Sequence, residues 1–410
     1  MKIAIVGAGI VGVTTAYELA ADGHQVTVFD QRSAAAEEAS FATAGLLAPH
    51  LLNPWAVPGF GQALRLTGAD ATLRLAGGLS RAHLAWLWRW RGQARRLSAP
   101  AAALERLAQY SQTRLHAIAA RHELDFEASE GRLVLLRTEQ DGAALQPALQ
   151  VLRDAGVALR EIDADTARQI EPGLSPEAPL AGAIHLPGAG AGNCRLFAQH
   201  LRQGMQGAGV DFAFNTRIDR ISTQPVGLAV QGDADLRRFD AVVLCAGMAS
   251  AALLPPLGLR LPMAAVQGYS VSAPLREDTH APRASVVDAA QQISIARLGQ
   301  RVRIAGGADL AGADARHHAP TLQRLYRTLN DWFPGGAQLS SGVQVWRGAR
   351  TLLPDGAPVL GASGLPGLWL NTGHGAGGWA LACGCARAVA DLMAGREPEV
   401  PLADLGLRDF

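Results

Sequence analysis

The first thirty residues, Met1–Asp30, constrain the fold of this chain more than any other stretch. A strand at Lys2–Val6 leads into a GxGxxG loop at Gly7–Gly12 and a helix at Val13–Ala21. A second strand follows at Gln25–Phe29 and ends in the acid Asp30. This order is a βαβ unit, and in that context the glycine pattern predicts a dinucleotide-binding site. A GxGxxG loop alone would equally fit a glycine turn in any α/β protein.

Each part of this unit has a physical reason. Gly7 permits a tight turn out of the strand, Gly9 lets a pyrophosphate approach the backbone, and Gly12 lets the helix pack closely on the sheet. The helix N-terminus favours phosphates through its unpaired N–H groups and its dipole. Asp30 follows Gly12 by 18 positions (30 minus 12), close to the ~20 expected of an acid that binds ribose hydroxyls. The unit does not say which dinucleotide binds.

The composition describes an ordinary globular protein. The chain has 410 residues, a formal net charge of +1, 49% hydrophobic and 18% charged residues. These values predict two or three domains, exclude a disordered chain and offer no broad basic face for nucleic acid. The apolar run after Lys2 resembles a signal peptide, but cleavage there would destroy the βαβ unit. No later uncharged apolar run is long enough to span a bilayer.

The four cysteines are expected to be packed thiols without a catalytic, disulfide or metal-binding role. Cys383 and Cys385 form CxC in an Ala-rich helical stretch, where side chains two positions apart point in different directions. We therefore expect packed thiols there, neither a disulfide nor a metal site, and no metal site elsewhere. This cysteine usage suits a reducing compartment and predicts a cytoplasmic location.

Glycine-rich and small-residue stretches recur along the chain. Phe239–Gly247 reads as a buried strand ending on small residues, which is typical of a parallel sheet whose carboxyl edge faces a ligand. Gly188–Gly192 reads as a loop, and Arg347–Gly361 as a loop-rich stretch between strands. Asn371–Gly378 is a second glycine loop, followed by a helix from Trp379. Ile293–Leu298 and Arg301–Ala305 form a predicted antiparallel pair.

Arg81–Arg96, RAHLAWLWRWRGQARR, has two interpretations. Alternating tryptophans with clustered arginines can mark a membrane surface or a partner interface. The plainer interpretation is a helix whose indoles fill the core while arginines cap its C-terminus. Both stay open at the level of sequence.

Five motifs, in order along nearly the whole chain, give it a family resemblance. They are GAGIVG with Asp30, SFATAGLLAP at Ser40–Pro49, LCAG at Leu244–Gly247, GARTLLPDGAPVLG at Gly348–Gly361 and NTGHGAGGWALACG at Asn371–Gly384. In these motifs the chain resembles the flavoprotein family of D-amino acid oxidases and glycine oxidases, and within it the bacterial D-amino acid dehydrogenases. It departs from the family at Thr43, Thr351, Leu353 and Gln267, which leaves the substrate open.

The resemblance implies an α/β fold with an α+β cap. A discontinuous Rossmann-like FAD-binding domain (1–60, 185–262 and 343–410) would join an antiparallel-sheet substrate domain (61–184 and 263–342). The implied reaction is FAD-dependent oxidative deamination of a D-amino acid, in which hydride passes from Cα to flavin N5 and water turns the imino acid into a 2-oxo acid and ammonia. Electrons would then pass to a quinone, another carrier or O₂, and a quinone acceptor would fit peripheral contact with the inner membrane face.

The resemblance also implies the site. Arg350 falls at the family's arginine and would clamp the substrate carboxylate, because a guanidinium matches a carboxylate bidentately. Tyr269, His374 and His50 are further catalytic candidates. Packing explains Tyr269 equally well, a buried and satisfied histidine is the commoner case for His50, and His374 more simply shapes its loop. The implied FAD contacts are Gly7, Gly9, Ile10, Gly12, Asp30, Gln31, Ser40, Thr43, Ala44, Gly45, Leu46, Ile218, Ala246, Gly247, Gly348, Arg350, Gly375, Ala376, Gly377, Gly378 and Trp379.

Other functions remain in view. A glycine or secondary-amine oxidase would use the same motifs, and so would a flavin-bearing subunit of a hetero-oligomeric amine dehydrogenase with a degenerate pocket. An NAD-dependent dehydrogenase would use the first βαβ unit alone, which leaves the second glycine loop unexplained. A tRNA-modifying amine oxidase would need a basic face that the net charge of +1 does not offer.

Overall fold

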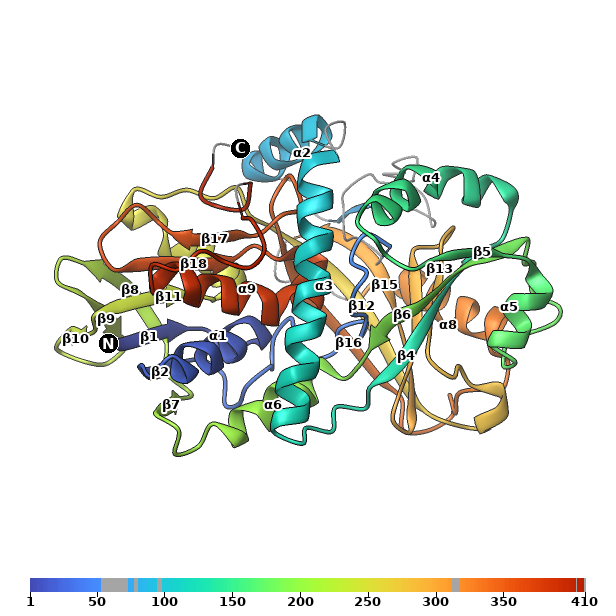
Figure 1. The fold of residues 1–410 in the computed structure, drawn as a ribbon, viewed down its shortest axis with the longest axis horizontal. Coiled ribbons are helices and arrows are strands. Elements are labelled where there is room, and N and C mark those ends of the chain that lie inside the picture. Colours follow the sequence, from blue (N-terminus) through green and yellow to red (C-terminus); the bar gives the residue numbers. More distant parts are fainter. Residues whose placement is uncertain (53–72, 77–79, 94–97, 312–316, 403, 409–410) are drawn as a thin grey trace.

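A computed structural model describes residues 1–52, 73–76, 80–93, 98–311, 317–402 and 404–408. Two large sheets lie in different halves of the molecule, and the long helix α3 stands between them (Figure 1). The helices are α1 (Ile10–Ala21), α2 (Arg81–Gln93), α3 (Ser98–Arg121), α4 (Glu139–Asp154), α5 (Ala164–Ile170), α6 (Cys194–Gly204), α7 (Ser250–Leu253), α8 (Ala319–Trp332) and α9 (Gly378–Met393).

The first sheet has six strands and is mainly parallel. Their order is β17 (Val359–Ala362), β18 (Leu368–Thr372), β11 (Ala241–Leu244), β1 (Lys2–Val6), β2 (Gln25–Phe29) and β7 (Val210–Ala213), with only β17 antiparallel to its neighbour. Ile3 and Ile5 pack with helices α1, α3, α6 and α9, while Ala4 and Val6 pack on the opposite face. Burial on both faces explains the unbroken apolar run of β1.

A small antiparallel sheet covers that opposite face. It consists of β10 (Arg237–Arg238), β9 (Val226–Val230) and β8 (Ile218–Thr223). Ile221 and Leu228 from this sheet share a core with Ala4 and Val6. This half is therefore a Rossmann-like layered unit, and the predicted βαβ unit is confirmed.

The second sheet has nine strands and is mainly antiparallel. Its order is β16 (Gln344–Leu352), β12 (Ala264–Pro274), β15 (Arg301–Ala311), β14 (Ile293–Leu298), β13 (Ser285–Asp288), β4 (Ser129–Leu136), β6 (Gly182–Ala191) and β5 (Arg160–Ile162), with β3 (Arg74–Ala76) on β15. Leu133 and Leu135 pack with α8, whereas Val134 and Leu136 pack with α4. Alternate residues of one strand thus bury opposite faces of the sheet.

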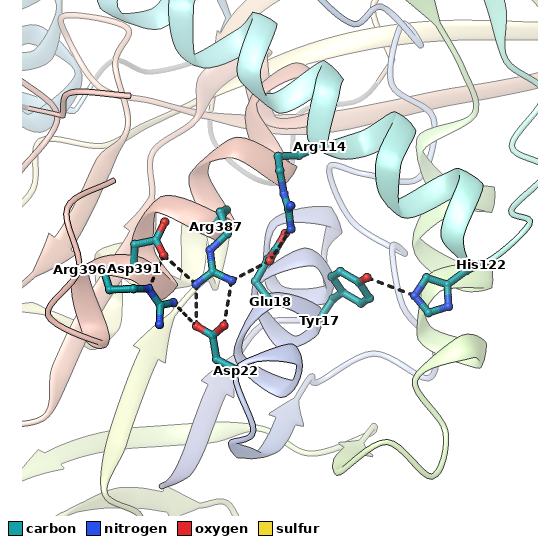
Figure 2. Close-up of polar contacts among 8 residues, drawn as sticks. All are labelled: Tyr17, Glu18, Asp22, Arg114, His122, Arg387, Asp391 and Arg396. Carbon is teal, nitrogen blue, oxygen red and sulfur yellow. Dashed lines mark hydrogen bonds and ion pairs between the residues drawn. The ribbon is translucent and has the colours of Figure 1, made fainter. Parts of the chain in front are cut away.

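Ion pairs tie α3 to the Rossmann-like half (Figure 2). Glu18 of α1 is fully buried, and it pairs with Arg114 of α3 at 2.7 Å and Arg387 of α9 at 2.9 Å. Arg387 also pairs with Asp22 and Asp391, which both bind Arg396. Three helices far apart in the sequence therefore share one charge network.

The structure corrects two loop predictions. The predicted loop at Gly188–Gly192 continues strand β6 through Ala191, because Gly190 and Ala191 pair with β4. Within the loop-rich stretch predicted at Arg347–Gly361, residues up to Leu352 belong to β16, which pairs with β12 along its whole length. Both strands belong to the nine-stranded sheet, although β16 lies inside a segment predicted to bind FAD and β6 extends into another. The domain division itself stays a prediction.

Helix α2 partly satisfies both interpretations of the Trp/Arg segment. Trp86 and Trp90 are buried, and their rings stack with centroids 5.9 Å apart. Trp88 is 79% exposed and Leu84 54% exposed. The helix therefore fills the core with one face and presents an apolar ridge to solvent with the other; residues 94–97, which include two of the clustered arginines, lie outside the described part. No described helix is long and apolar enough to cross a membrane.

Candidate active site

Two glycines of the first loop, Gly7 and Gly12, stand where no side chain fits. Gly7 has a φ of 107°, and a Cβ atom there would lie 2.5 Å from the carbonyl oxygen of Cys245. A Cβ atom at Gly12 would lie 1.8 Å from the carbonyl oxygen of Gly7. Gly9 is the N-cap of α1 and makes no side-chain cap, and Ile10 N donates to Ser40 Oγ at 3.0 Å. The strand, turn and helix thus fit the close backbone approach that a pyrophosphate requires.

Asp30 lies at the carboxyl end of β2 and faces this loop. Its Oδ2 accepts a hydrogen bond from Ala8 N at 2.6 Å, and its Oδ1 accepts one from Arg32 N at 2.8 Å. Gln31 beside it is exposed. Ile218 lies on β8 and packs beside the cluster that contains Phe29. The carboxylate is therefore fixed at the loop, with lone pairs left for ribose hydroxyls.

The parallel strands bring further predicted contacts to the same edge, because their carboxyl ends all point one way. Ala246 and Gly247 follow β11, and the loop from Gly373 to Gly377 follows β18. Strand β16 passes beside both turns: Leu352 forms an isolated bridge with His374, and Gly247 approaches Thr351. The glycine loop after β18 thus lies at the same sheet edge as the glycine loop after β1.

The segment Ser40–Pro49 runs between the two sheets. The carbonyl oxygen of Gly45 accepts a hydrogen bond from Trp379 Nε1 at 3.1 Å, and that of Thr43 accepts one from Arg303 Nη1 at 3.2 Å. Leu46 forms an isolated bridge with Ala191. Helix α9 and the nine-stranded sheet therefore hold this segment from both sides, with the half-buried Ala44 between them.

His50 is buried against the second glycine loop. A Cβ atom at Gly377 would lie 2.4 Å from His50 Cε1. The backbone N–H groups of His50 and Leu51 donate to Glu105 Oε2 at 2.9 and 3.3 Å, and desolvation raises the pKa of that buried carboxyl group. Glu105 of α3 thus fixes the backbone that carries the imidazole. No local pattern in the sequence indicates this role of Glu105, because the contact depends on tertiary packing.

Arg350 is a half-buried cation on β16 rather than in a loop. Its guanidinium lies over Gly268 of β12, and Nη1 donates to the carbonyl oxygen of Gly307 at 3.1 Å. Burial lowers its pKa to about 10, so the group stays charged at neutral pH. Within the described residues no carboxylate pairs with it. Such a cation is suited to bind an anionic ligand.

His374 lies close to Arg350 along the structure, because its bridge partner Leu352 is two residues beyond Arg350 on β16. Its ring is buried, and desolvation lowers its pKa to about 3. Nε2 has no hydrogen-bond partner among the described residues. The imidazole is therefore neutral at physiological pH.

Tyr269 is placed differently. It packs with Leu325 and Leu329 of α8, and its hydroxyl donates to Asp309 at 2.5 Å and accepts from His318 N at 3.3 Å. Desolvation, with Asp309 adding to it, raises the pKa of the hydroxyl. The structure gathers the glycine loops, Arg350, His374 and His50, whereas the Tyr269 hydroxyl already has partners on the α8 side of the sheet. A substrate role for Tyr269 stays a prediction.

Comparison with known proteins agrees with this arrangement. The model of the DAO family, described as FAD dependent oxidoreductase, matches residues 2–392. The chain belongs to this family. It is thus an FAD-dependent oxidoreductase, and the glycine loops and Asp30 fit the dinucleotide on geometry alone. A D-amino acid dehydrogenase of Cereibacter sphaeroides is 40% identical over 423 residues, which cover 100% of this chain and 95% of the relative.

Solved structures share the fold. Glycine oxidase from Geobacillus kaustophilus has a TM-score of 0.74 at 23% identity, with 100% of this chain and 98% of that chain covered. L-proline dehydrogenase from P. horikoshii also has a TM-score of 0.74, at 16% identity, with 98% and 95% covered. At these identities the likeness shows the fold alone, which hosts enzymes named for different amino acids.

Proposed function

We propose that this flavoprotein oxidises a D-amino acid to its 2-oxo acid and ammonia and passes the electrons to a quinone or another carrier. The main support is Arg350, a half-buried guanidinium beside the glycine loops that lacks a carboxylate partner in the described part of the chain. The 40% identity to a protein named D-amino acid dehydrogenase supports the choice of substrate class.

The proposed cofactor site uses both ends of the chain. Gly7, Gly9, Ile10 and Gly12 would bind the pyrophosphate. The ribose and adenine would contact Asp30, Gln31 and Ile218; the flavin would contact Ser40, Thr43, Ala44, Gly45, Leu46, Ala246, Gly247, Gly348, Arg350, Gly375, Ala376, Gly377, Gly378 and Trp379. In the proposed division, residues 1–60, 185–262 and 343–410 bind FAD and the remainder forms the substrate domain.

The protein's own part in the reaction is positioning. FAD, when bound, supplies the acceptor for the two electrons and the hydrogen that leave Cα. Arg350 holds the substrate carboxylate and thereby orients Cα. The amine must arrive uncharged, because a protonated amine has no lone pair to form the C=N bond. Since the His374 ring is neutral and buried, it shapes the loop and does not store a proton. Water then hydrolyses the imino acid.

Anaerobic titration of the purified protein tests this proposal. We expect a flavin spectrum that bleaches with D-amino acids and stays oxidised with L-amino acids. Bleaching by glycine or D-proline alone would favour the glycine or secondary-amine oxidase instead. Bound flavin that no amine reduces would favour the flavin-bearing subunit. Oxygen uptake compared with reduction of a soluble quinone separates an oxidase from a dehydrogenase.

We also propose that the enzyme works in the cytoplasm against the inner membrane face, with the outer face of α2 as the contact. Leu84 and Trp88 are exposed there, with Arg81, Arg89 and Arg91 beside them. Indole and guanidinium groups suit the headgroup region of an anionic bilayer. Co-sedimentation with phosphatidylglycerol vesicles tests this contact, and Trp88→Ala should weaken it while anaerobic reduction of the flavin stays normal.

A further inference from the structure

Two glycines face each other in the sheet beside Arg350. Gly268 of β12 and Gly348 of β16 are directly paired in the antiparallel register. The guanidinium of Arg350 covers the first: a Cβ atom at Gly268 would lie 2.5 Å from Nη2. The indole of Trp346 covers the second: a Cβ atom at Gly348 would lie 1.8 Å from Cη2. Each glycine is therefore needed for the large side chain above it.

This pairing makes the indole and the guanidinium neighbours. Directly opposed positions of an antiparallel pair have Cβ atoms about 5 Å apart. Because Trp346, Gly348 and Arg350 alternate along β16, their side-chain directions point to one face of the sheet. The two groups that fill the empty Cβ positions thus lie side by side on that face.

The indole is held on one side and half-buried overall. Its ring stacks on Phe41 with centroids 6.3 Å apart and planes 21° from parallel. The guanidinium of Arg195 lies 4.1 Å from the centroid of Phe41. Phe41 belongs to the segment Ser40–Pro49, so this face of the sheet is turned toward the proposed flavin site. The stack fixes the indole while part of its surface stays accessible to a ligand.

From this geometry we propose that Trp346 forms a wall of the substrate side-chain site and selects D-amino acids with apolar, flat side chains. The inference rests on the proposed function, because it takes Arg350 as the carboxylate clamp. A carboxylate on Arg350 places the rest of a small amino acid within reach of the indole. Flat apolar groups gain from stacking there. Arg350 lies beside the indole, Arg195 lies over the Phe41 ring and Arg303 binds the Thr43 carbonyl oxygen, and these cations disfavour cationic side chains.

The kinetic test compares D-phenylalanine with D-alanine. In Trp346→Ala we expect the ratio of their kcat/KM values to fall by about 10-fold or more, the scale of a lost apolar contact. Trp346→Phe should keep most of the ratio. The control is Val345→Ala, an exposed neighbour whose side chain points to the other face, and it should leave the ratio unchanged. An unchanged ratio in a flavin-loaded Trp346→Ala, or a parent enzyme that prefers D-lysine or D-glutamate, would overturn the inference.

A binding test separates this inference from the proposed function. The affinities of benzoate and acetate, measured through their effect on the flavin spectrum, test the contact with Trp346 without turnover. We expect Trp346→Ala to weaken benzoate about 10-fold and acetate little. If no D-amino acid reduces the flavin of the parent enzyme, the proposed reaction is wrong. The benzoate and acetate affinities still show whether Trp346 contacts a bound ligand. Equal weakening of both ligands would contradict it, and Trp346→Leu provides the same comparison should the alanine variant not fold.

Discussion

The guanidinium of Arg350 lies over Gly268, the residue on the neighbouring strand that has no side chain to displace it. Register and side-chain identity together therefore set the position of this guanidinium. Arg350 pairs across the strands with Val266, so its side chain extends along the sheet by two residues to reach Gly268 and the carbonyl oxygen of Gly307. Within the described part of the chain, Arg350 donates one side-chain hydrogen bond, to Gly307, so further guanidinium N–H groups can donate to a ligand.

Gly268→Ala should displace the guanidinium of Arg350. The new methyl group would meet Nη2 at 2.5 Å, so the guanidinium must move. We expect kcat/KM for D-amino acids to fall about 10- to 100-fold, as misplacement by about 1 Å can cause, with FAD still bound. Steady-state kinetics and the flavin spectrum measure both effects. Gly188→Ala, where no atom lies within 4 Å, is the control and should behave as the parent.

Arg350→Ala should retain flavin and lose substrate reduction. Removing a charge-assisted bidentate partner costs about 2–5 kcal/mol in buried sites, which corresponds to at least about 30-fold in kcat/KM. Stopped-flow reduction under anaerobic conditions measures the loss. Near-normal reduction in this variant would remove Arg350 from the substrate site.

Gly12→Ala should abolish FAD binding. A Cβ atom at this position would lie 1.8 Å from the carbonyl oxygen of Gly7, which is backbone and cannot rotate away. The helix would separate from the glycine loop, and the purified protein should be colourless or fail to fold. Gly92→Ala tests a helical glycine with no atom within 4 Å, and it should keep the yellow flavin spectrum.

The sequence predicts the cofactor half of the site better than the substrate half. The βαβ unit, β11 and the glycine loop before α9 are local patterns, and the structure confirms these elements because strand, turn and helix signals agree within each. The segment around Arg350 is different. RGAR has the glycine and small residues of a loop, yet β16 pairs with β12, and no local signal reveals that partner.

Contacts between residues far apart in the chain could not be predicted from local sequence patterns for the same reason. The opposition of Gly268 and Gly348 exists only in one register of two strands that lie about 80 residues apart in the chain. Glu105 looks like one acid on an amphipathic helix, and only tertiary packing shows it buried under His50. Trp86 and Trp88 differ in burial because of the helix phase, which the dense run of tryptophans hides.

The charge network of Figure 2 predicts an order of stability losses. Among the described residues, Arg387 is 12% exposed and pairs with three acids, whereas Arg114 is 31% exposed and pairs with Glu18. We expect Arg387→Ala to cost about 3 kcal/mol, since it removes one of two cations from the buried Glu18 and also one from each of Asp22 and Asp391, and Arg114→Ala about 1 kcal/mol. Thermal unfolding of the flavin-loaded variants should show the larger loss of stability for Arg387→Ala. Arg153→Ala, which breaks an exposed pair, should change little; equal losses for all three would contradict the assignment.

His374 provides the last prediction, on pH. Burial holds its pKa at about 3, below the ordinary 6.5, so the folded ring is neutral where the unfolded one is charged. Its contribution to stability is therefore present above pH 6.5 and lost as the pH falls toward 3, and the parent should lose more stability over that range than His374→Asn. The His374 ring should take no part in catalysis. In both the parent and His374→Asn, kcat/KM should rise with pH as the substrate ammonium loses its proton, and the apparent pKa of that rise should be the same. A pKa that vanishes in His374→Asn would make His374 the base, against the burial that keeps its proton affinity low.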